Sequence, residues 1–272
     1  MAEYSRYLRP NGLEGIEALH ARFVRHAYRP HSHPTWTVAV VERGAARFDH
    51  DSTKQRAGEG ELFVLEPEAV HTGMAAVPEG WAYKVLYIEP QVVHDWAERD
   101  GSAPRAARWV VFRDRALRAA LERAHDALAA ETAGGLGVDE AVLGAVAALR
   151  PHLRPGRRSG ERKDRAEHAA VRRARRHLHE RWDERVTLAE LAAVAGLSRF
   201  ELVRRFGEQN GVSPHAFQTN LRIDHARALL ASGAAPAAVA AACGFADQPH
   251  LTRVFKRAVG VSPGRYARAL AS

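Results

Sequence analysis

Cysteine is nearly absent from this chain of 272 residues, because Cys243 is the only one. A single cysteine excludes an internal disulfide and any metal site built from several cysteines. Cys243 ends an Ala-rich run with helical character. At such a position a small buried side chain is expected rather than a reactive thiol.

Long apolar segments are missing as well. No stretch reaches the roughly 18 apolar residues that a membrane-spanning helix needs, and the first residues lack the apolar core of a signal peptide. We therefore expect a cytoplasmic protein that has no membrane partner. The length is sufficient for two domains of ordinary size, each with its own hydrophobic core.

Sequence patterns of enzymes are also lacking. No nucleophile is paired with a base, and neither a Gly-rich phosphate loop nor a motif of paired carboxylates stands out. We therefore expect no catalytic residues, no cofactor and no enzymatic activity.

Positive charge is what the chain has in excess, and it is unevenly distributed. Residues 1–153 contain 18 Lys and Arg against 21 Asp and Glu, a net charge of −3, whereas residues 154–272 contain 22 against 11, a net charge of +11. Such an asymmetry indicates a polyanionic partner for the C-terminal half, bound with a salt-dependent affinity. The alternative is an Arg-rich surface that is merely solvated.

Two segments of the basic half, residues 195–214 and 243–263, repeat each other about 48 residues apart. In each, a helical run rich in small residues ends at a Gly, and a second helical run follows. The second run carries apolar pairs at i, i+4 spacing, namely Leu202 with Phe206 and Leu251 with Phe255. This pattern predicts two helix-turn-helix motifs whose second helices have a buried apolar face.

The opposite face of each second helix is basic. The side chains expected to meet phosphates or base edges in a DNA major groove are Arg199, Arg204, Arg205, Arg253, Lys256 and Arg257. Because basic charge and the helix-turn-helix pattern coincide twice, double-stranded DNA is the expected partner.

The N-terminal half has the pattern of an antiparallel β domain. Short apolar or alternating runs, at residues 35–41, 61–65 and 81–88 among others, are separated by Gly, Pro and charged residues. Turns are expected at 42–44 and 58–60, and a sandwich or barrel is the expected architecture.

Two helices are expected next, between Asp114 and Leu153, separated by Gly134 and Gly135. Their apolar residues offer either a dimer contact or a face that packs onto the β domain. These residues are Leu117, Leu121, Leu128, Val142, Leu143, Val146 and Leu149. Residues 154–165 contain no apolar side chain other than proline and are typical of an exposed linker.

Three histidines of the β region have a spacing that brings them together. His31 and His33 alternate on or near one strand and point to the same side, and His71 on a neighbouring strand would complete three metal ligands. The surrounding pattern resembles the two sequence motifs of the cupin β-barrels, on the basis of Pro30, His31, Ser32, His33, Gly44, Gly60, Pro67 and His71.

Metal-binding cupins have a Glu four residues after the second histidine, where this chain has Thr37. Without that carboxylate we expect no metal, and we expect the histidines to contact or orient a polar organic effector. The resemblance implies an effector pocket lined by His31, His33, Trp36, Phe48, His71 and Tyr83. For the three aromatic members, a place in the hydrophobic core is the alternative.

The most specific signature lies at residues 240–266. It contains Gly-Phe at 244–245, Asp247, Phe-Lys at 255–256 and Gly-x-Ser-Pro-x-x-Tyr at 260–266. This segment resembles the signature of the AraC/XylS type of bacterial transcription regulator. Residues 221–230 are similar to the long helix that connects the two motifs in that family.

The resemblance implies an α+β multidomain fold, with an N-terminal cupin-like antiparallel β-barrel followed by helices and a C-terminal all-α domain with two helix-turn-helix motifs. The expected parts are a ligand-sensing domain at 10–110, dimerisation helices at 111–153, a linker at 154–165 and a DNA-binding domain at 166–272. The family's base-facing positions correspond to Phe200, Val203 and Arg204, with Arg199 near the helix start, and in the second motif to Gln248, Pro249, Thr252 and Arg253.

The implied function is sequence-specific regulation of transcription, controlled by a small-molecule effector bound in the barrel. The implied partners are double-stranded DNA, the effector and a second copy of the chain, with RNA polymerase as a further candidate. One alternative is a metal-dependent cupin enzyme fused to a DNA-binding domain. Another is an architectural nucleic-acid binder that has no effector.

Overall fold

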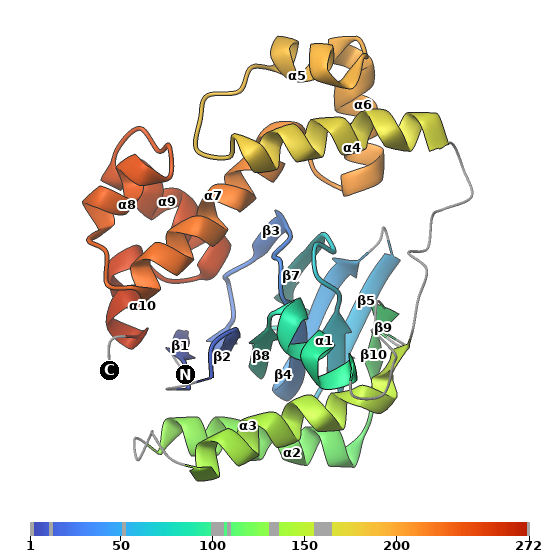
Figure 1. The fold of residues 1–272 in the computed structure, drawn as a ribbon. Coiled ribbons are helices and arrows are strands. Elements are labelled where there is room, and N and C mark those ends of the chain that lie inside the picture. Colours follow the sequence, from blue (N-terminus) through green and yellow to red (C-terminus); the bar gives the residue numbers. More distant parts are fainter. Residues whose placement is uncertain are drawn as a thin grey trace. The chain divides into compact units, whose positions relative to one another are not determined.

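A computed structural model gives the structure of the protein and describes residues 3–10, 13–50, 53–98, 106–107, 110–130, 136–154 and 165–270. The chain forms two compact units (Figure 1). The first comprises residues 1–27, 34–69 and 73–159, and the second comprises residues 28–33, 70–72 and 160–272. Most of the predicted linker, residues 155–164, and the predicted break at Gly134 and Gly135 lie outside the described residues.

The N-terminal strands form an antiparallel sheet, as predicted. Along the sheet the strand order is β1-β2-β8-β4-β6-β10, with β5 and β7 also paired to β4 and β3 paired to β7. A separate pair joins β9 to β11. The strands are β1 (Tyr4–Leu8), β2 (Ile16–Phe23), β3 (Tyr28–His31), β4 (Trp36–His50), β5 (Thr53–Gly58), β6 (Leu62–Leu65), β7 (His71–Ala75), β8 (Trp81–Ile88), β9 (Ala106–Ala107), β10 (Val111–Phe112) and β11 (Leu153–Arg154).

The turn predicted at residues 42–44 is wrong, because β4 continues through it. The pairing of β4 with β8 shifts register between Val41 and Arg43, which is a β-bulge. Gly44 has a φ of 71°, and a Cβ at this position would lie 2.1 Å from the carbonyl oxygen of Gly80. The glycine therefore serves the bulge and a close backbone approach. The second predicted turn, at 58–60, is present.

Three helices follow the main strands: α1 (Pro90–Glu98), α2 (Arg115–Ala129) and α3 (Leu136–Leu149), with a short 3₁₀ turn, η1 (Arg150–His152), after them. The sequence pattern did not predict α1. Asp114 caps α2 by accepting a hydrogen bond from the backbone N–H of Leu117. Beside the sheet (Figure 1), α2 and α3 share one hydrophobic core with β4, β6 and β8.

That core contains most of the apolar residues expected to form either a dimer contact or a packing face. Leu117, Leu121, Leu128, Val142, Val146 and Leu149 are all buried in it. Leu143, in contrast, is 43% exposed. The packing alternative is what the structure shows for these six residues. A dimer contact stays a prediction and has to use the outer face of the helices.

The described part of the C-terminal unit after the linker is helical, as predicted. Its helices are α4 (Arg165–Glu180), α5 (Leu188–Ala195), α6 (Arg199–Asn210), α7 (Pro214–Ala231), α8 (Pro236–Ala242), α9 (Gln248–Val259) and α10 (Pro263–Leu270). Helices α5 and α6 form the first helix-turn-helix motif, α8 and α9 form the second, and α7 connects them (Figure 1). Among the described residues, no helix is long and apolar enough to cross a membrane.

Candidate DNA-binding surface and histidine cluster

In both motifs the turn between the two helices contains a glycine with a positive φ and a side chain that caps the second helix. Gly196 ends α5 in the left-handed conformation, and Ser198 then caps α6 in a capping box with Glu201. In the second motif Gly244 has a φ of 67°, and Asp247 caps α9 by accepting a hydrogen bond from the backbone of His250. The repeat in the sequence is therefore also a repeat of turn and cap.

The predicted core positions of both second helices are buried. Leu202, Phe206, Leu251 and Phe255 each have 0% exposure. Phe206 meets the ring of Phe217 edge to face at 5.5 Å, and Phe255 and Tyr266 meet similarly, with ring centroids 5.4 Å apart. These contacts fix one face of α6 and of α9, so the opposite face of each helix is turned outward.

The predicted DNA-contacting residues lie on those outward faces. Phe200 is 79% exposed and Val203 is 41% exposed, so α6 presents apolar surface beside its arginines. Arg205 and Thr252 are half-buried. The exposed members of the predicted set are Arg199, Phe200, Val203, Arg204, Gln248, Pro249, Arg253, Lys256 and Arg257.

Two of the arginines on α6 are paired within their own helix, which the sequence reasoning missed. Arg204 Nη1 lies 2.9 Å from both carboxylate oxygens of Glu208, and Arg205 Nη2 lies 3.4 Å from Glu201 Oε1. Exposed pairs of this i, i+4 kind contribute only about 0.3–0.5 kcal/mol. Arg204 can therefore leave Glu208 for a stronger partner at little cost.

Two polar side chains of α7, which the sequence reasoning also missed, bind the segment before α5, and one of them also reaches the second motif. The buried Gln218 donates from Nε2 to the backbone carbonyls of Arg181, Trp182 and Glu184. Arg222 donates to the carbonyl of Trp182 at 2.9 Å and to that of Gly244 at 2.7 Å. One guanidinium thus joins the segment before α5 to the turn between α8 and α9.

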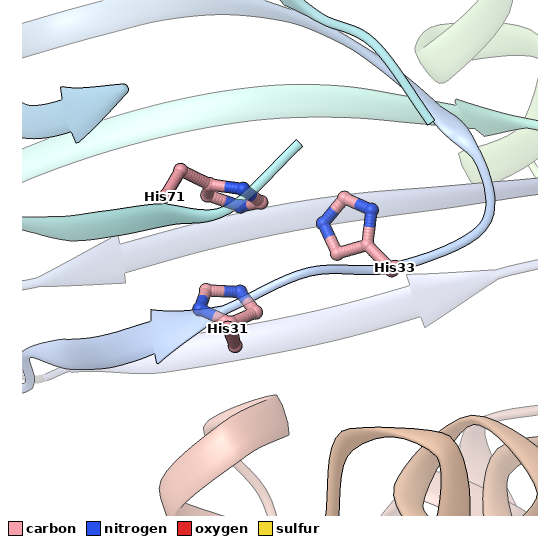
Figure 2. A group of neighbouring side chains, drawn as sticks. All are labelled: His31, His33 and His71. Carbon is pink, nitrogen blue, oxygen red and sulfur yellow. The ribbon is translucent and has the colours of Figure 1, made fainter. Parts of the chain in front are cut away.

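The three predicted histidines come together (Figure 2). His31 ends β3, His33 follows it by two residues, and His71 begins β7, the strand that pairs with β3. One ring nitrogen from each lies within 4.8 Å of the other two. His33 and His71 are buried, and His31 is half-buried.

A backbone contact selects the tautomer of His31. Its Nδ1 lies 2.8 Å from the carbonyl oxygen of Arg29. A carbonyl oxygen only accepts, so in the neutral ring Nδ1 carries the proton and Nε2 carries the lone pair.

The aromatic members of the predicted pocket have two different surroundings within the first unit. Trp36 is buried in the hydrophobic core with α2 and α3. Phe48 contacts Phe63 with ring centroids 5.0 Å apart, and Tyr83 stacks on Trp81 at 3.8 Å. The indole Nε1 of Trp81 is buried and has no hydrogen-bond partner among the described residues, a feature that the sequence reasoning missed.

Comparison with known proteins agrees with both halves of the structure. Residues 14–146 match the AraC-like ligand binding domain, and residues 191–269 match a helix-turn-helix domain. The chain belongs to the AraC family of transcription regulators. This confirms the predicted family, the predicted fold class and the prediction of a DNA-binding regulator with an N-terminal ligand-binding domain.

Relatives of this AraC-family chain are themselves described as regulators. YbfI of Bacillus subtilis strain 168, an uncharacterized HTH-type transcriptional regulator, is 26% identical over 239 residues, which are 87% of this chain and 86% of the relative. The HTH-type transcriptional regulator MtrA of Neisseria gonorrhoeae is 39% identical over 80 residues, which are 29% of this chain and 27% of MtrA.

Solved structures support the same AraC-family fold. ToxT from Vibrio cholerae O395 superposes with a TM-score of 0.58 at 12% identity, covering 96% of this chain and 100% of ToxT. An apo variant of ToxT from strain SCE256 gives 0.61 at 14% identity, with the same coverage. The comparisons give no support to a cupin enzyme fused to a DNA-binding domain.

Proposed function

We propose that α6 and α9 read two neighbouring segments of one DNA site and that an organic effector in the N-terminal domain controls this binding. The observation that carries the proposal is the duplicated motif. In each copy the second helix buries its apolar pair completely and exposes a face that carries basic side chains. Two such helices, joined by one continuous helix, suit two successive major-groove segments about 34 Å apart.

Each exposed side chain has a contact that its chemistry favours. Arg204 and Arg253 suit bidentate pairing with guanine, and Gln248 suits adenine. Phe200 and Val203 suit the methyl group of thymine, since both are exposed and apolar. Pro249 and Thr252, which also stand at base-facing positions of the family, suit apolar contacts with base edges. The remaining members of the set suit the phosphates that flank these bases, and they are Arg199, Arg205, Lys256 and Arg257.

The aromatic cluster of the N-terminal domain suits an organic effector. Phe48, Tyr83 and Trp81 supply ring surface, and the unpartnered indole N–H of Trp81 is a donor for an acceptor group on the effector. A ToxT structure contains an unsaturated fatty acid, which is a molecule of this kind. The expected contacts of His31, His33 and His71 with a polar effector stay a prediction.

Two further partners complete the proposal. A homodimer would read two such sites, and the exposed Leu143 on α3 is the residue of the predicted contact that remains available for it. RNA polymerase is the partner through which a bound regulator changes transcription. A regulator that binds DNA and RNA polymerase works in the cytoplasm, where both are found in bacteria, and we propose this location and a regulatory role without enzymatic activity for the chain.

Selection from random duplex DNA tests the proposal. The full-length protein, at one fixed salt concentration, should retain duplexes that share two short sequence elements about 10 base pairs apart, one helical turn. The salt must be fixed because counterion release makes the affinity salt-dependent. Retained duplexes that share no sequence would show general binding to the phosphate backbone and would contradict the proposal.

A further inference from the structure

We infer that His31, His33 and His71 form a binding site for one divalent transition-metal ion of the zinc class. The inference concerns the histidine cluster alone and does not rest on DNA binding. It begins with the convergence of the rings. One nitrogen from each ring lies within 4.8 Å of the others, on segments joined by the pairing of β3 with β7 (Figure 2).

The spacing matches a metal centre after small side-chain rotations. Zinc binds imidazole nitrogen at about 2.0–2.1 Å, so two ligands of a tetrahedral site lie about 3.4 Å apart. The nitrogens of the cluster are separated by no more than 4.8 Å, a gap that rotation of the rings about their side-chain bonds closes. Zinc, copper, iron and nickel all accept imidazole ligands.

The tautomer of His31 is the one that a metal ligand needs. Histidine ligands characteristically donate the N–H of their other ring nitrogen to a carboxylate, a backbone carbonyl or water. His31 has this arrangement, because its Nδ1 lies 2.8 Å from the carbonyl oxygen of Arg29. That contact leaves the lone pair on Nε2 and restrains the ring.

The missing carboxylate at Thr37 does not exclude a metal. Three neutral histidines hold zinc in a known class of sites, in which a fourth position is left to water or another small ligand. The expectation of no metal rested on the missing carboxylate alone. With Thr37 in place of the carboxylate, the chain supplies three ligands, and water or another small ligand takes the fourth position.

The alternative is a cluster of histidines that only hydrogen-bond to one another and to the backbone. Such a cluster binds no ion, and its side chains contribute only to packing. A metal titration separates the two cases. Only a bound ion has a fixed number per chain, gives an absorption spectrum and is displaced by a competing ion.

The test uses untagged full-length protein, freed of metal with a chelator and then titrated with Zn²⁺ or with Co²⁺ as a spectroscopic probe. We expect one ion per chain and Co²⁺ absorption bands that Zn²⁺ displaces. His31→Gln and His71→Gln should each weaken Zn²⁺ binding about a hundredfold or more. Replacing a residue that only hydrogen-bonds to a metal ligand already costs about 10- to 100-fold, and replacing a ligand itself should cost at least as much. His215→Gln, which alters an exposed histidine on α7, is the matched control.

Circular dichroism and DNA binding of each variant show whether it remains folded. His31→Gln is the decisive variant, since His31 is only half-buried and its replacement disturbs little packing. Wild-type protein that binds no ion at micromolar Zn²⁺, or binding that His31→Gln and His71→Gln leave unchanged, would overturn the inference. Selection of specific DNA by metal-free protein would in that case leave the proposed function intact.

Discussion

Helix α6 carries one aromatic ring that is buried in the domain core and another that is exposed. Phe206 has 0% exposure and packs against Phe217, whereas Phe200, six positions earlier, is 79% exposed. The i, i+4 pattern in the sequence was sufficient to predict which ring is buried. It could not reveal the pairing of Arg204 with Glu208, because either side chain of an exposed ion pair has many rotamers and several partners within reach.

Substitution of the two rings should have unequal effects on stability. Phe206→Ala removes a fully buried ring and should lower the free energy of unfolding by about 3–5 kcal/mol. Phe200→Ala removes an exposed ring from the same helix and should change it by no more than about 0.5 kcal/mol. Denaturant unfolding of both variants measures the difference. Equal losses would contradict the assignment of buried and outward faces.

A buried histidine in the N-terminal unit gives stability a dependence on pH. His125 on α2 is 2% exposed, and its Nε2 donates to the carbonyl of Val85 at 3.0 Å. Burial lowers the pKa of His125 from 6.5 to about 4. Between these values the unfolded chain binds more protons than the folded chain, so stability falls as the pH falls through this window.

The loss should reach at most about 3 kcal/mol near pH 4, the free energy that corresponds to a shift of this size. His125→Gln keeps a donor for the Val85 carbonyl and removes the titration. Thermal unfolding between pH 4 and pH 7 should therefore depend less on pH in this variant than in the wild type. Identical pH profiles would mean that other groups cause the acid sensitivity.

At the scale of elements, sequence periodicity predicted most helices but misplaced some boundaries of the sheet. The repeat predicted α5, α6, α8 and α9, since the turns and the apolar spacing agree there. The charged sequence Glu42-Arg43-Gly44 also looks like a turn, yet β4 passes through it as a bulge. A glycine with a positive φ is typical of a turn and also of a β-bulge. Only the pairing of the strand with its neighbour distinguishes the two.

The contacts of α7 were beyond sequence reasoning for a different reason. Arg222 binds carbonyl groups 40 residues before it and 22 residues after it in the chain. Backbone carbonyls occur at every residue, so no residue pattern marks these as partners. The histidines were easier to bring together, because His31 at the end of one strand, His33 two residues later and His71 on the paired strand are neighbours in an antiparallel sheet.

Loss of the Arg222 guanidinium should loosen the two motifs relative to each other. Arg222→Ala leaves the carbonyl of Gly244 without this donor, at a cost of about 1–3 kcal/mol if the group stays buried and unpaired, whereas the carbonyl of Trp182 keeps Gln218 as a donor. We expect lower thermal stability and a larger loss of affinity for a two-segment DNA site than for one segment. Arg222→Lys keeps the charge but loses the forked set of donors, so its thermal stability and two-segment affinity should lie between those of the wild type and of Arg222→Ala. Unchanged two-segment affinity in Arg222→Ala would contradict this role.

At the scale of the whole molecule, composition already separated the two halves. The net charge of −3 for residues 1–153 and of +11 for residues 154–272 indicates that only the C-terminal half meets a polyanion. The structure adds that this half exposes two basic helices from two copies of one motif. The effector, the operator and the dimer contact depend on other molecules, so neither the sequence nor a single chain specifies them.

The central claim is that one chain reads two DNA segments, one with α6 and one with α9. The most direct measurement repeats the selection from random DNA with Arg204→Ala and Arg253→Ala, both of which alter exposed side chains. Each variant should lose base preference, by about 1–3 kcal/mol, in one segment and keep it in the other. A uniform loss of affinity for all sequences, or a loss in the same segment for both variants, would contradict the account.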